Sequence, residues 1–273
     1  MNKPIRKALC VLALCATAQW AHAGQLEHIK ARGTLVCGVL GTFAPFGYTD
    51  PSTRSLVGYD VDFCKAIATQ LGVKAQVKPM SVAARIPELQ QGRVDVLVAG
   101  LAYTRQRARQ VAFSDSYYVG YDYLLVRKGQ GLDSPSALSG KRVGVTDGGI
   151  VGSYVKRAVP GAVLVGYEDT PTAFAALVQG KVQAFIASEM LERRLLSKLG
   201  AASSRYQFIH PALGKEVWGV GVRKDAPHLL AAVNRALVAT EQSGQAARIF
   251  NQWLGAGTLY KMQRDFRIQP MGH

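Results

Sequence analysis

The chain has 273 residues, of which 48% are hydrophobic and 19% are charged, a balance that excludes an intrinsically disordered protein. Its 33 Lys and Arg against 18 Asp and Glu give a net charge of +15, which fits a nucleic acid, an anionic membrane surface or an anionic small ligand as partner. The length allows one large domain or two smaller ones, each with its own core.

The first 23 residues have the features of a signal peptide. A basic start (3–7) precedes an apolar run (8–18) that is shorter than the roughly 20 residues needed to span a bilayer. Ala21 and Ala23 then fit the small-x-small pattern of a cleavage site. We expect cleavage near Ala23, a periplasmic location, and a mature chain with 30 basic and 18 acidic side chains, a net charge of +12. A short N-terminal membrane anchor is the alternative.

Apolar runs separated by turn residues predict strands that alternate with helices. The first half contains a buried strand (34–40), a helix (60–71) that Gly72 ends, and a second strand (94–99). Further strands are predicted at 124–127, 142–145, 163–165, 183–187 and 215–223. One helix begins with Thr170 as N-cap and ends at Gly180, and the last two helices are predicted at 227–243 and 245–254. This alternation predicts an α/β protein with open, doubly wound sheets.

An internal repeat divides the chain into two halves. Residues 89–99 (LQQGRVDVLVA) and 177–187 (LVQGKVQAFIA) each contain a helix end, a glycine, a basic residue and a buried strand. The repeat predicts two similar α/β lobes rather than one long sheet. Ligands of such sheets bind beyond the carboxyl ends of the strands, which here are Gly100 and the pair Ser188 and Glu189.

Several motifs carry a resemblance to a known family. The segment GYDVDF (58–63), followed by Ile67 and Ala68, is similar to the signature of the family 3 extracellular solute-binding proteins of amino-acid ABC transporters. Further similar segments follow in order at 43–46, 85–92, 94–95, 104–107, 113–115, 138–141 and around Trp253. The resemblance covers nearly the whole mature chain.

The resemblance implies the type II periplasmic binding protein fold. In that fold two α/β lobes are joined by a two-strand hinge and close on the ligand, the Venus-flytrap mechanism. The implied division is a signal peptide (1–23), a discontinuous first lobe (24–123 and 217–273) and a second lobe (124–216).

Arg107 is the first candidate for ligand binding. Its planar guanidinium can hold a carboxylate through two hydrogen bonds, and the residue falls on the position that, by resemblance, binds the ligand α-carboxylate. A solvated basic turn is the alternative, because Arg105 and Arg109 surround it.

The first lobe supplies three further candidates. Gly100 leaves its backbone approachable where a ligand-facing loop needs it. Phe43 falls on the position of an aromatic residue that stacks on the ligand, with core packing as the alternative. Arg85 resembles the position that holds a side-chain carboxylate in binders of acidic amino acids, and a surface arginine at a helix start is the alternative.

The second lobe supplies the turn that contains Gly149 and Ile150. This turn begins a helix, and exposed N–H groups at a helix start can bind a carboxylate. A simple strand-to-helix turn is the alternative.

Four site positions depart from the family pattern. Ser188 stands where the family usually has an Asp that pairs with the ligand ammonium, and Glu189 follows it. Ala102 replaces a hydroxyl side chain, and Val82 replaces an aromatic one. Because a buried ammonium without a counter-charge is costly, either Glu189 turns into the cleft or the ligand has no free α-amino group.

The resemblance implies the binding component of an ABC importer that takes a polar or acidic amino acid, or a similar small carboxylate, and hands it to a membrane permease. We expect a monomer with no catalytic residue, metal or cofactor, since no HExxH motif, Cys/His ligand spacing or nucleophile elbow occurs. Export and the absence of a basic helix with interleaved aromatics argue against nucleic acid. The alternatives are a sensory module and a cyclohexadienyl or arogenate-type dehydratase on the same scaffold, with Glu189 as general acid.

The mature chain keeps two cysteines, Cys37 in a predicted strand and Cys64 in the next predicted helix. Their even number and the oxidising periplasm allow a disulfide. Two buried free thiols are the alternative, because cysteine packs well as a small hydrophobic residue.

Overall fold

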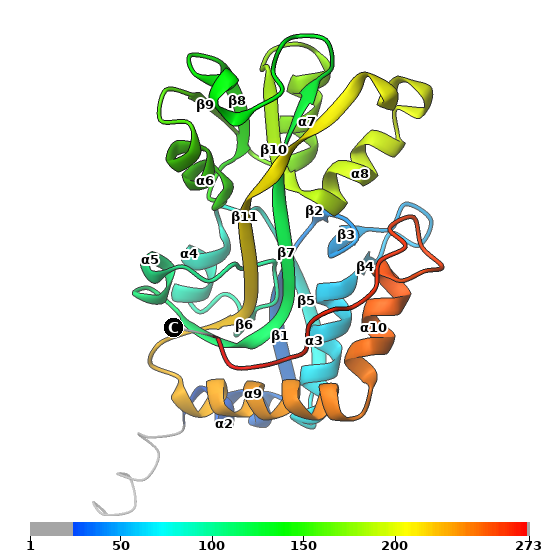
Figure 1. Ribbon diagram of the computed structural model, residues 1–273. Helices are drawn as coiled ribbons and strands as arrows, with labels where there is room; N and C mark the ends of the chain where they lie inside the picture. The colour runs from blue at the N-terminus through cyan, green and yellow to red at the C-terminus, as the bar shows by residue number, and fades with distance from the viewer. Residues whose placement is uncertain (1–23, 272–273) are drawn as a thin grey trace, which may run out of the picture.

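The computed structural model describes residues 24–271, and the predicted signal peptide lies outside the described residues. Figure 1 shows two groups of helices and strands, one above the other, that two long strands connect. The α/β fold predicted from the alternation of strands and helices is confirmed.

The lower half in Figure 1 is a parallel sheet covered by helices. Its strands are β1 (Thr34–Leu40), β5 (Lys74–Met80) and β6 (Val96–Leu97), with β1 in the middle. Its helices are α2 (Gln25–Arg32), α3 (Tyr59–Gln70), α4 (Arg85–Gln90), α5 (Arg105–Ala108), α9 (Pro227–Gln242) and α10 (Gln245–Leu254). A small antiparallel sheet of β2 (Thr42–Phe43), β3 (Gly47–Thr49) and β4 (Leu56–Val57) lies beside them. Helix α3 buries Phe63 and Ile67 in the core of this half.

The upper half repeats this arrangement on a smaller scale. Its strands are β8 (Arg142–Thr146), β9 (Val163–Tyr167) and β10 (Ala184–Ser188), and its helices are α6 (Val151–Ala158), α7 (Thr170–Val178) and α8 (Glu189–Ser197). Helix α7 begins one residue earlier than predicted, because the side chain of Asp169 rather than Thr170 accepts the capping hydrogen bond, from the Thr172 N–H at 2.9 Å.

The long antiparallel strands β7 (Ala112–Arg127) and β11 (Tyr206–Val222) run through both halves. The strand order β5-β1-β6-β11-β7-β10-β8-β9 therefore forms one eight-stranded ladder. The sequence predicts two lobes rather than one long sheet. The two groups of strands are instead joined in one continuous sheet, because β7 and β11 pair with each other and each also pairs with one of the groups. The predicted lobe boundaries, 123/124 and 216/217, fall inside β7 and β11.

A bulge interrupts β11 where it passes from one half to the other. The register changes from Leu124 opposite Ile209 to Asp122 opposite Gly214, so that four residues of β11 face the single residue Tyr123. Such a bulge locally removes ladder hydrogen bonds and bends the strand.

The two copies of the sequence repeat occupy equivalent places. Strand β6 pairs with β1 in parallel and with β11 in antiparallel orientation, and β10 pairs in the same way with β8 and β7. In both copies the glycine after the helix adopts a left-handed conformation, with φ of +69° at Gly92 and +73° at Gly180.

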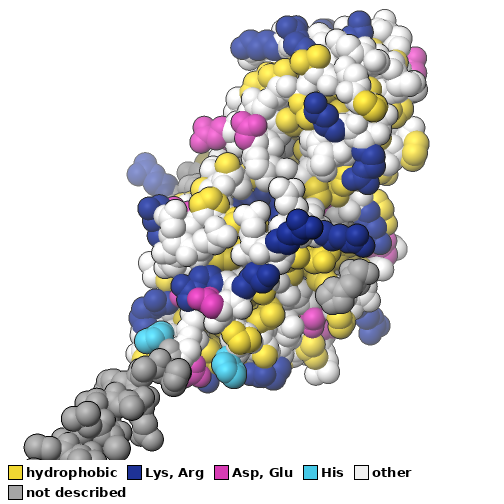
Figure 2. Space-filling view, turned by 90° about the vertical axis from the view of Figure 1, so that its left-hand side faces the viewer, with side chains coloured by type: hydrophobic (Ala, Val, Ile, Leu, Met, Phe, Trp, Pro, Cys, Tyr) yellow, Lys and Arg dark blue, Asp and Glu magenta, His cyan; other side chains and the backbone are white. Residues whose placement is uncertain are grey.

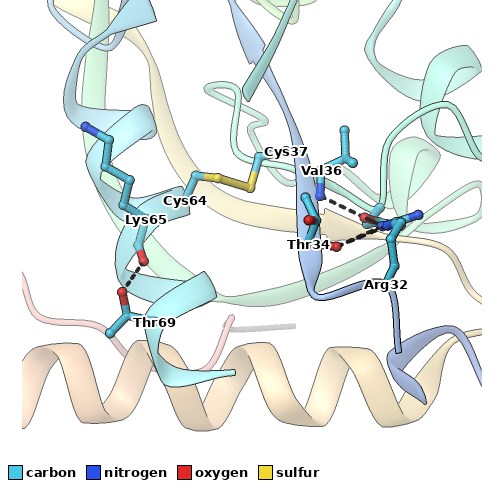
Figure 3. Close-up of a disulfide and its surroundings, with 8 residues drawn as sticks. Arg32, Thr34, Val36, Cys37, Cys64, Lys65 and Thr69 are labelled. Atoms are coloured by element: carbon cyan, nitrogen blue, oxygen red, sulfur yellow. Dashed lines mark hydrogen bonds and ion pairs between the residues drawn. A yellow bond between two sulfur atoms is a disulfide. The ribbon is translucent and has the colours of Figure 1, made fainter. Parts of the chain in front are cut away.

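Cys37 of β1 and Cys64 of α3 form a disulfide, which decides between the two alternatives that the sequence left open (Figure 3). Both cysteines are fully buried. The bond therefore fastens helix α3 to the central strand of its half.

Reduction of this disulfide is expected to destabilise the protein. Because the bond closes a loop over a sequence separation of 27 residues, its loss should lower the free energy of unfolding by about 3 to 4 kcal/mol. Urea unfolding with and without reductant measures this difference. In the double variant Cys37→Ala/Cys64→Ala, the free energy of unfolding should be the same with and without reductant. Equal stability of oxidised and reduced wild type would contradict the expectation.

Among residues 24–271, none of the helices combines the length and apolar character needed to cross a membrane. The same residues contain no cluster of His, Cys, Asp and Glu suited to a metal ion. Figure 2 shows Lys and Arg side chains over both halves of one face, where they outnumber Asp and Glu. On this face much of the positive charge is therefore surface charge.

Candidate functional site

A cleft lies between the two halves, where loops after the strands of both groups meet the hinge strands. Its empty space, including the part open to solvent, is about 490 Å³. Eight of the ten predicted ligand-binding residues line it: Phe43, Val82, Arg85, Gly100, Arg107, Gly149, Ile150 and Ser188. The repeat and the family resemblance thus pointed to residues that the fold brings together from both halves.

Arg107 lies at the cleft with part of its guanidinium available. The hydroxyl of Thr104 caps helix α5 by accepting the Arg107 N–H at 3.0 Å, which sets the start of this short turn. The guanidinium donates to the carbonyl of Ala102 at 2.8 Å and to the carbonyl of Gly148, in the other half, at 3.0 Å. These two bonds use two of its five N–H groups, so a fork remains for an anion. Its flanking neighbours Arg105 and Arg109 are exposed.

Arg85 is buried, with 4% of its surface exposed, and its N–H groups are largely occupied. It donates to the carbonyls of Val82, Ala99, Gly100 and Gly148 at 2.9 to 3.3 Å. Burial and the charge of Arg107 lower the pKa of Arg85 to about 9, which leaves it charged at neutral pH. With four carbonyls bound, Arg85 retains one N–H for a ligand and mainly joins the loops of the cleft.

Aromatic rings form the floor of the cleft. Phe43 is half-buried and lies 5.8 Å from Trp218 between ring centroids, while Trp218 itself is almost fully buried. Gly100 packs on these rings with φ of +55°, and a Cβ there would lie 3.0 Å from Phe43. Its N–H donates to the hydroxyl of Tyr117 at 3.3 Å, and that hydroxyl donates to Asp60 at 2.9 Å. Asp60 of the GYDVDF motif thus supports the ligand-facing loop from behind.

The upper half contributes the turn before α6 and the end of β10. Gly149 and Ile150 line the cleft from this turn, and the carbonyl of Gly148 beside them accepts from both arginines. Ser188 is buried, with 6% of its surface exposed, and its hydroxyl oxygen has no hydrogen-bond partner among the described residues.

Two predicted site residues lie outside the cleft lining. Ala102 is buried beside Trp218, and only its carbonyl takes part, as an acceptor of Arg107. Glu189 begins helix α8 and binds Arg193, one turn further along the helix, at 2.6 and 2.8 Å. The Glu189 side chain is therefore committed to a surface ion pair and does not face the cleft.

Sequence reasoning missed two acidic residues of the cleft, Asp122 and Glu216. They belong to the hinge strands β7 and β11 and line the cleft with 1% and 9% of their surface exposed. Acids inside otherwise buried strands are uncommon unless they are paired, and this was the available signal.

Asp122 and Glu216 influence each other strongly. Asp122 lies opposite Gly214, and Glu216 lies opposite Gly120, so the two carboxyl groups are diagonal neighbours on one face of the ladder. Burial raises the pKa of Asp122 well above its usual range, and the charge of Glu216 raises it further. Burial also raises the pKa of Glu216, whose carboxylate accepts the indole N–H of Trp218 at 2.5 Å. Arg107 and Arg85 oppose this rise, so Asp122 holds its proton more firmly than Glu216 does.

Comparison with known proteins agrees with this geometry. The model of the bacterial extracellular solute-binding proteins, family 3, matches residues 35–256. The L-cystine-binding protein TcyJ of Escherichia coli K12 is 28% identical over 251 residues, which are 91% of this chain and 93% of that protein. The ABC transporter glutamine-binding protein GlnH of Bacillus subtilis is 29% identical over 233 residues, with 84% of each chain covered.

Solved structures with the same fold include amino-acid-binding proteins. An ancestral arginine-binding protein bound to arginine superposes with a TM-score of 0.76 at 35% identity, over 82% of this chain and 99% of that one. An ancestral amino acid-binding protein, described as a precursor of cyclohexadienyl dehydratase, has a TM-score of 0.74 at 27% identity, over 85% and 100% of the two chains. The predicted type II periplasmic binding protein architecture is thereby confirmed. The family match spans most of the chain, and the protein belongs to the bacterial extracellular solute-binding proteins, family 3.

Proposed function

We propose that the protein captures a free amino acid in the cleft and delivers it to the permease of an ABC importer in the periplasm. The observation that carries the proposal is the set of N–H groups that Arg107 leaves available at the cleft between the two halves. The relatives, which bind cystine, glutamine or arginine, support the same class of ligand.

Closure couples binding to delivery. Arg107 and Arg85 both reach the carbonyl of Gly148 from the opposite half, so the closed state brings the two halves into contact at the cleft. A ligand that touches both halves favours this state over the open one, and a permease can then recognise the closed form. We propose that the monomer suffices, because both halves come from one chain.

We infer binding without turnover. Glu189, the general acid of the dehydratase alternative, binds Arg193 outside the cleft lining. The two acids that do line the cleft, Asp122 and Glu216, belong to the hinge strands, and incubation with prephenate and arogenate tests them for turnover. The neighbour described as a precursor of a dehydratase is itself an amino acid-binding protein, which supports the same interpretation.

A panel of ligands tests the proposed function. Thermal unfolding is followed with each of the twenty amino acids, L-cystine, succinate, prephenate and arogenate, because a ligand that binds only the folded state raises the melting temperature. We expect one or a few amino acids to stabilise the protein, with no conversion of prephenate or arogenate during long incubation. A panel in which no amino acid stabilises the protein, or in which prephenate or arogenate is consumed, contradicts the proposal.

A further inference from the structure

The cleft has an acidic end that the carboxylate of a ligand does not explain. Ser188, Asp122 and Glu216 come from β10, β7 and β11, which are neighbours in the ladder. Ser188 lies directly opposite Asp122, and Glu216 is the diagonal neighbour of Asp122 on the other side. Their side chains therefore form a row across three adjacent strands on the face that lines the cleft.

Two oxygen atoms of this row are buried without a partner. The Oδ2 atom of Asp122 and the Oγ atom of Ser188 have no hydrogen-bond partner among the described residues. Such atoms are costly to bury, and a folded protein keeps them where a ligand or another group satisfies them. Both residues line the cleft, so these buried atoms lie in its wall.

The chemistry of the row favours a cation. Carboxylates accept hydrogen bonds, and a hydroxyl accepts as well as donates, whereas an ammonium group carries three donors and no acceptor. The residue opposite Asp122 is Gly214, and the ring of Tyr154 packs where a side chain at Gly214 would lie, so the acids face the cleft beside an aromatic ring. Arg107 supplies the opposite polarity in the same cleft.

We propose that Asp122 and Glu216, with the hydroxyl of Ser188, bind the α-ammonium group of the captured amino acid while Arg107 holds its carboxylate. This inference rests on the proposed function and deepens it, because it assigns a cationic subsite to the hinge strands. A zwitterion satisfies both ends of the cleft, whereas a carboxylic acid without an amine leaves the acidic end unsatisfied. The ligand class is accordingly free α-amino acids rather than simple carboxylates.

In the empty cleft a proton takes the place of the ammonium. The charged and titratable groups around the two acids are Arg85 of α4, Arg107 of α5, Tyr118 of β7, Tyr154 of α6 and Glu192 of α8. The two arginines favour ionisation of Glu216, whereas burial and the neighbouring carboxyl group of Glu216 disfavour a charge on Asp122. A bound ammonium reverses this balance and releases the proton from the pair.

The sign of the pH dependence follows from this exchange. The carboxyl pKa is raised in the empty cleft and falls when a cation binds, so binding releases a proton. Affinity for an α-amino acid should therefore rise with pH across the interval between the ordinary carboxyl range and the raised pKa of the pair. A desamino ligand gives no such release.

The first experiment compares an amino acid with its own desamino counterpart by titration calorimetry. The amino acid is the best one in the panel, and the counterpart has hydrogen in place of the amine; for L-glutamine it is glutaramic acid, and for L-arginine it is 5-guanidinopentanoic acid. We expect the amino acid to bind at least 100-fold more tightly, with proton release seen as a dependence of the heat on the buffer. Affinities within about tenfold of each other, or binding without proton release, overturn the inference.

The second experiment uses isosteric variants. Asp122→Asn and Glu216→Gln should each weaken binding of the amino acid by about 10- to 100-fold, the loss of a hydrogen bond to a charged group. Neither should weaken binding of the desamino counterpart, because loss of a negative charge near Arg107 leaves that arginine better able to hold a carboxylate. Asp115→Asn is the matched control, because Asp115 lies on the same strand β7 and does not line the cleft. If a variant does not fold, the inference is still tested by the wild type, through the proton release measured by calorimetry when the amino acid binds.

The two proposals fail in different ways. Absence of any stabilising amino acid in the panel overturns the proposed function and this inference with it. Tight binding of amino acids that is unaffected by removal of the ligand amine, or by Asp122→Asn and Glu216→Gln together, overturns only the inference.

Discussion

Replacement of Arg107 by alanine should weaken ligand binding by about 100-fold or more while the protein stays folded. The guanidinium has a free fork at the cleft, and truncation of one partner of a buried charge pair typically costs 2 to 5 kcal/mol, much of it from the carboxylate left unpaired. Calorimetry with the best amino acid from the panel measures the affinity, and circular dichroism checks the fold.

Arg105→Ala is the matched control for this change. Arg105 lies on the same short helix, is exposed, and does not line the cleft, so its removal alters the net charge by the same amount without touching the site. Arg107→Lys should fall between wild type and Arg107→Ala, because an ammonium keeps the charge and loses the bidentate geometry. Unchanged affinity in Arg107→Ala would remove Arg107 from the site.

Replacement of Gly148 by alanine should prevent closure of the two halves. A Cβ at Gly148 would lie 2.6 Å from the Cα atom of Ala83 and 3.0 Å from its backbone nitrogen, in the opposite half. Backbone atoms cannot give way as a flexible side chain does, so the halves must stay apart. We expect affinity to fall by about 100-fold, with small-angle scattering that shows no compaction when the ligand is added.

The control for Gly148→Ala separates closure from backbone strain. Gly140 has the same left-handed conformation, with φ of +71° against +72°, but a Cβ there meets nothing within 4 Å. Both substitutions should lower the free energy of unfolding by about 1 to 2 kcal/mol, the cost of alanine in this conformation. Only Gly148→Ala should impair binding, and equal impairment by Gly140→Ala would show that strain rather than contact is the cause.

Much of the fold could be predicted because local patterns dominate it. Strand β1 was predicted with its observed bounds from an apolar run, and α3 within one residue at each end from its periodicity and the glycine that follows. Strand β5 was not predicted, since it is an edge strand whose polar residues weaken the pattern. Of β7 only the last residues were predicted, because acids and tyrosines interrupt its apolar run.

The loop residues of the candidate site could be predicted from the sequence, whereas the acids of the hinge strands could not. The loop residues around Arg107 and Gly100 follow recognisable strand ends, so their meeting in a cleft could be inferred. Asp122 and Glu216 lie 94 positions apart in the sequence and become neighbours only through the register of two antiparallel strands. The Cys37–Cys64 pairing likewise depends on a Cα–Cα distance of 6.2 Å that spacing along the chain does not reveal.

The bulge in β11 makes the two hinge strands unequal. Strand β7 is uninterrupted at the crossing, whereas β11 carries three extra residues there, so we expect bending to concentrate in β11. Asp122 lies on the uninterrupted strand beside this bulge, so we expect it to move less than Arg107 and Gly148 when the cleft closes. We expect an incoming amino acid to contact the acids of the hinge strands before the two halves close over it.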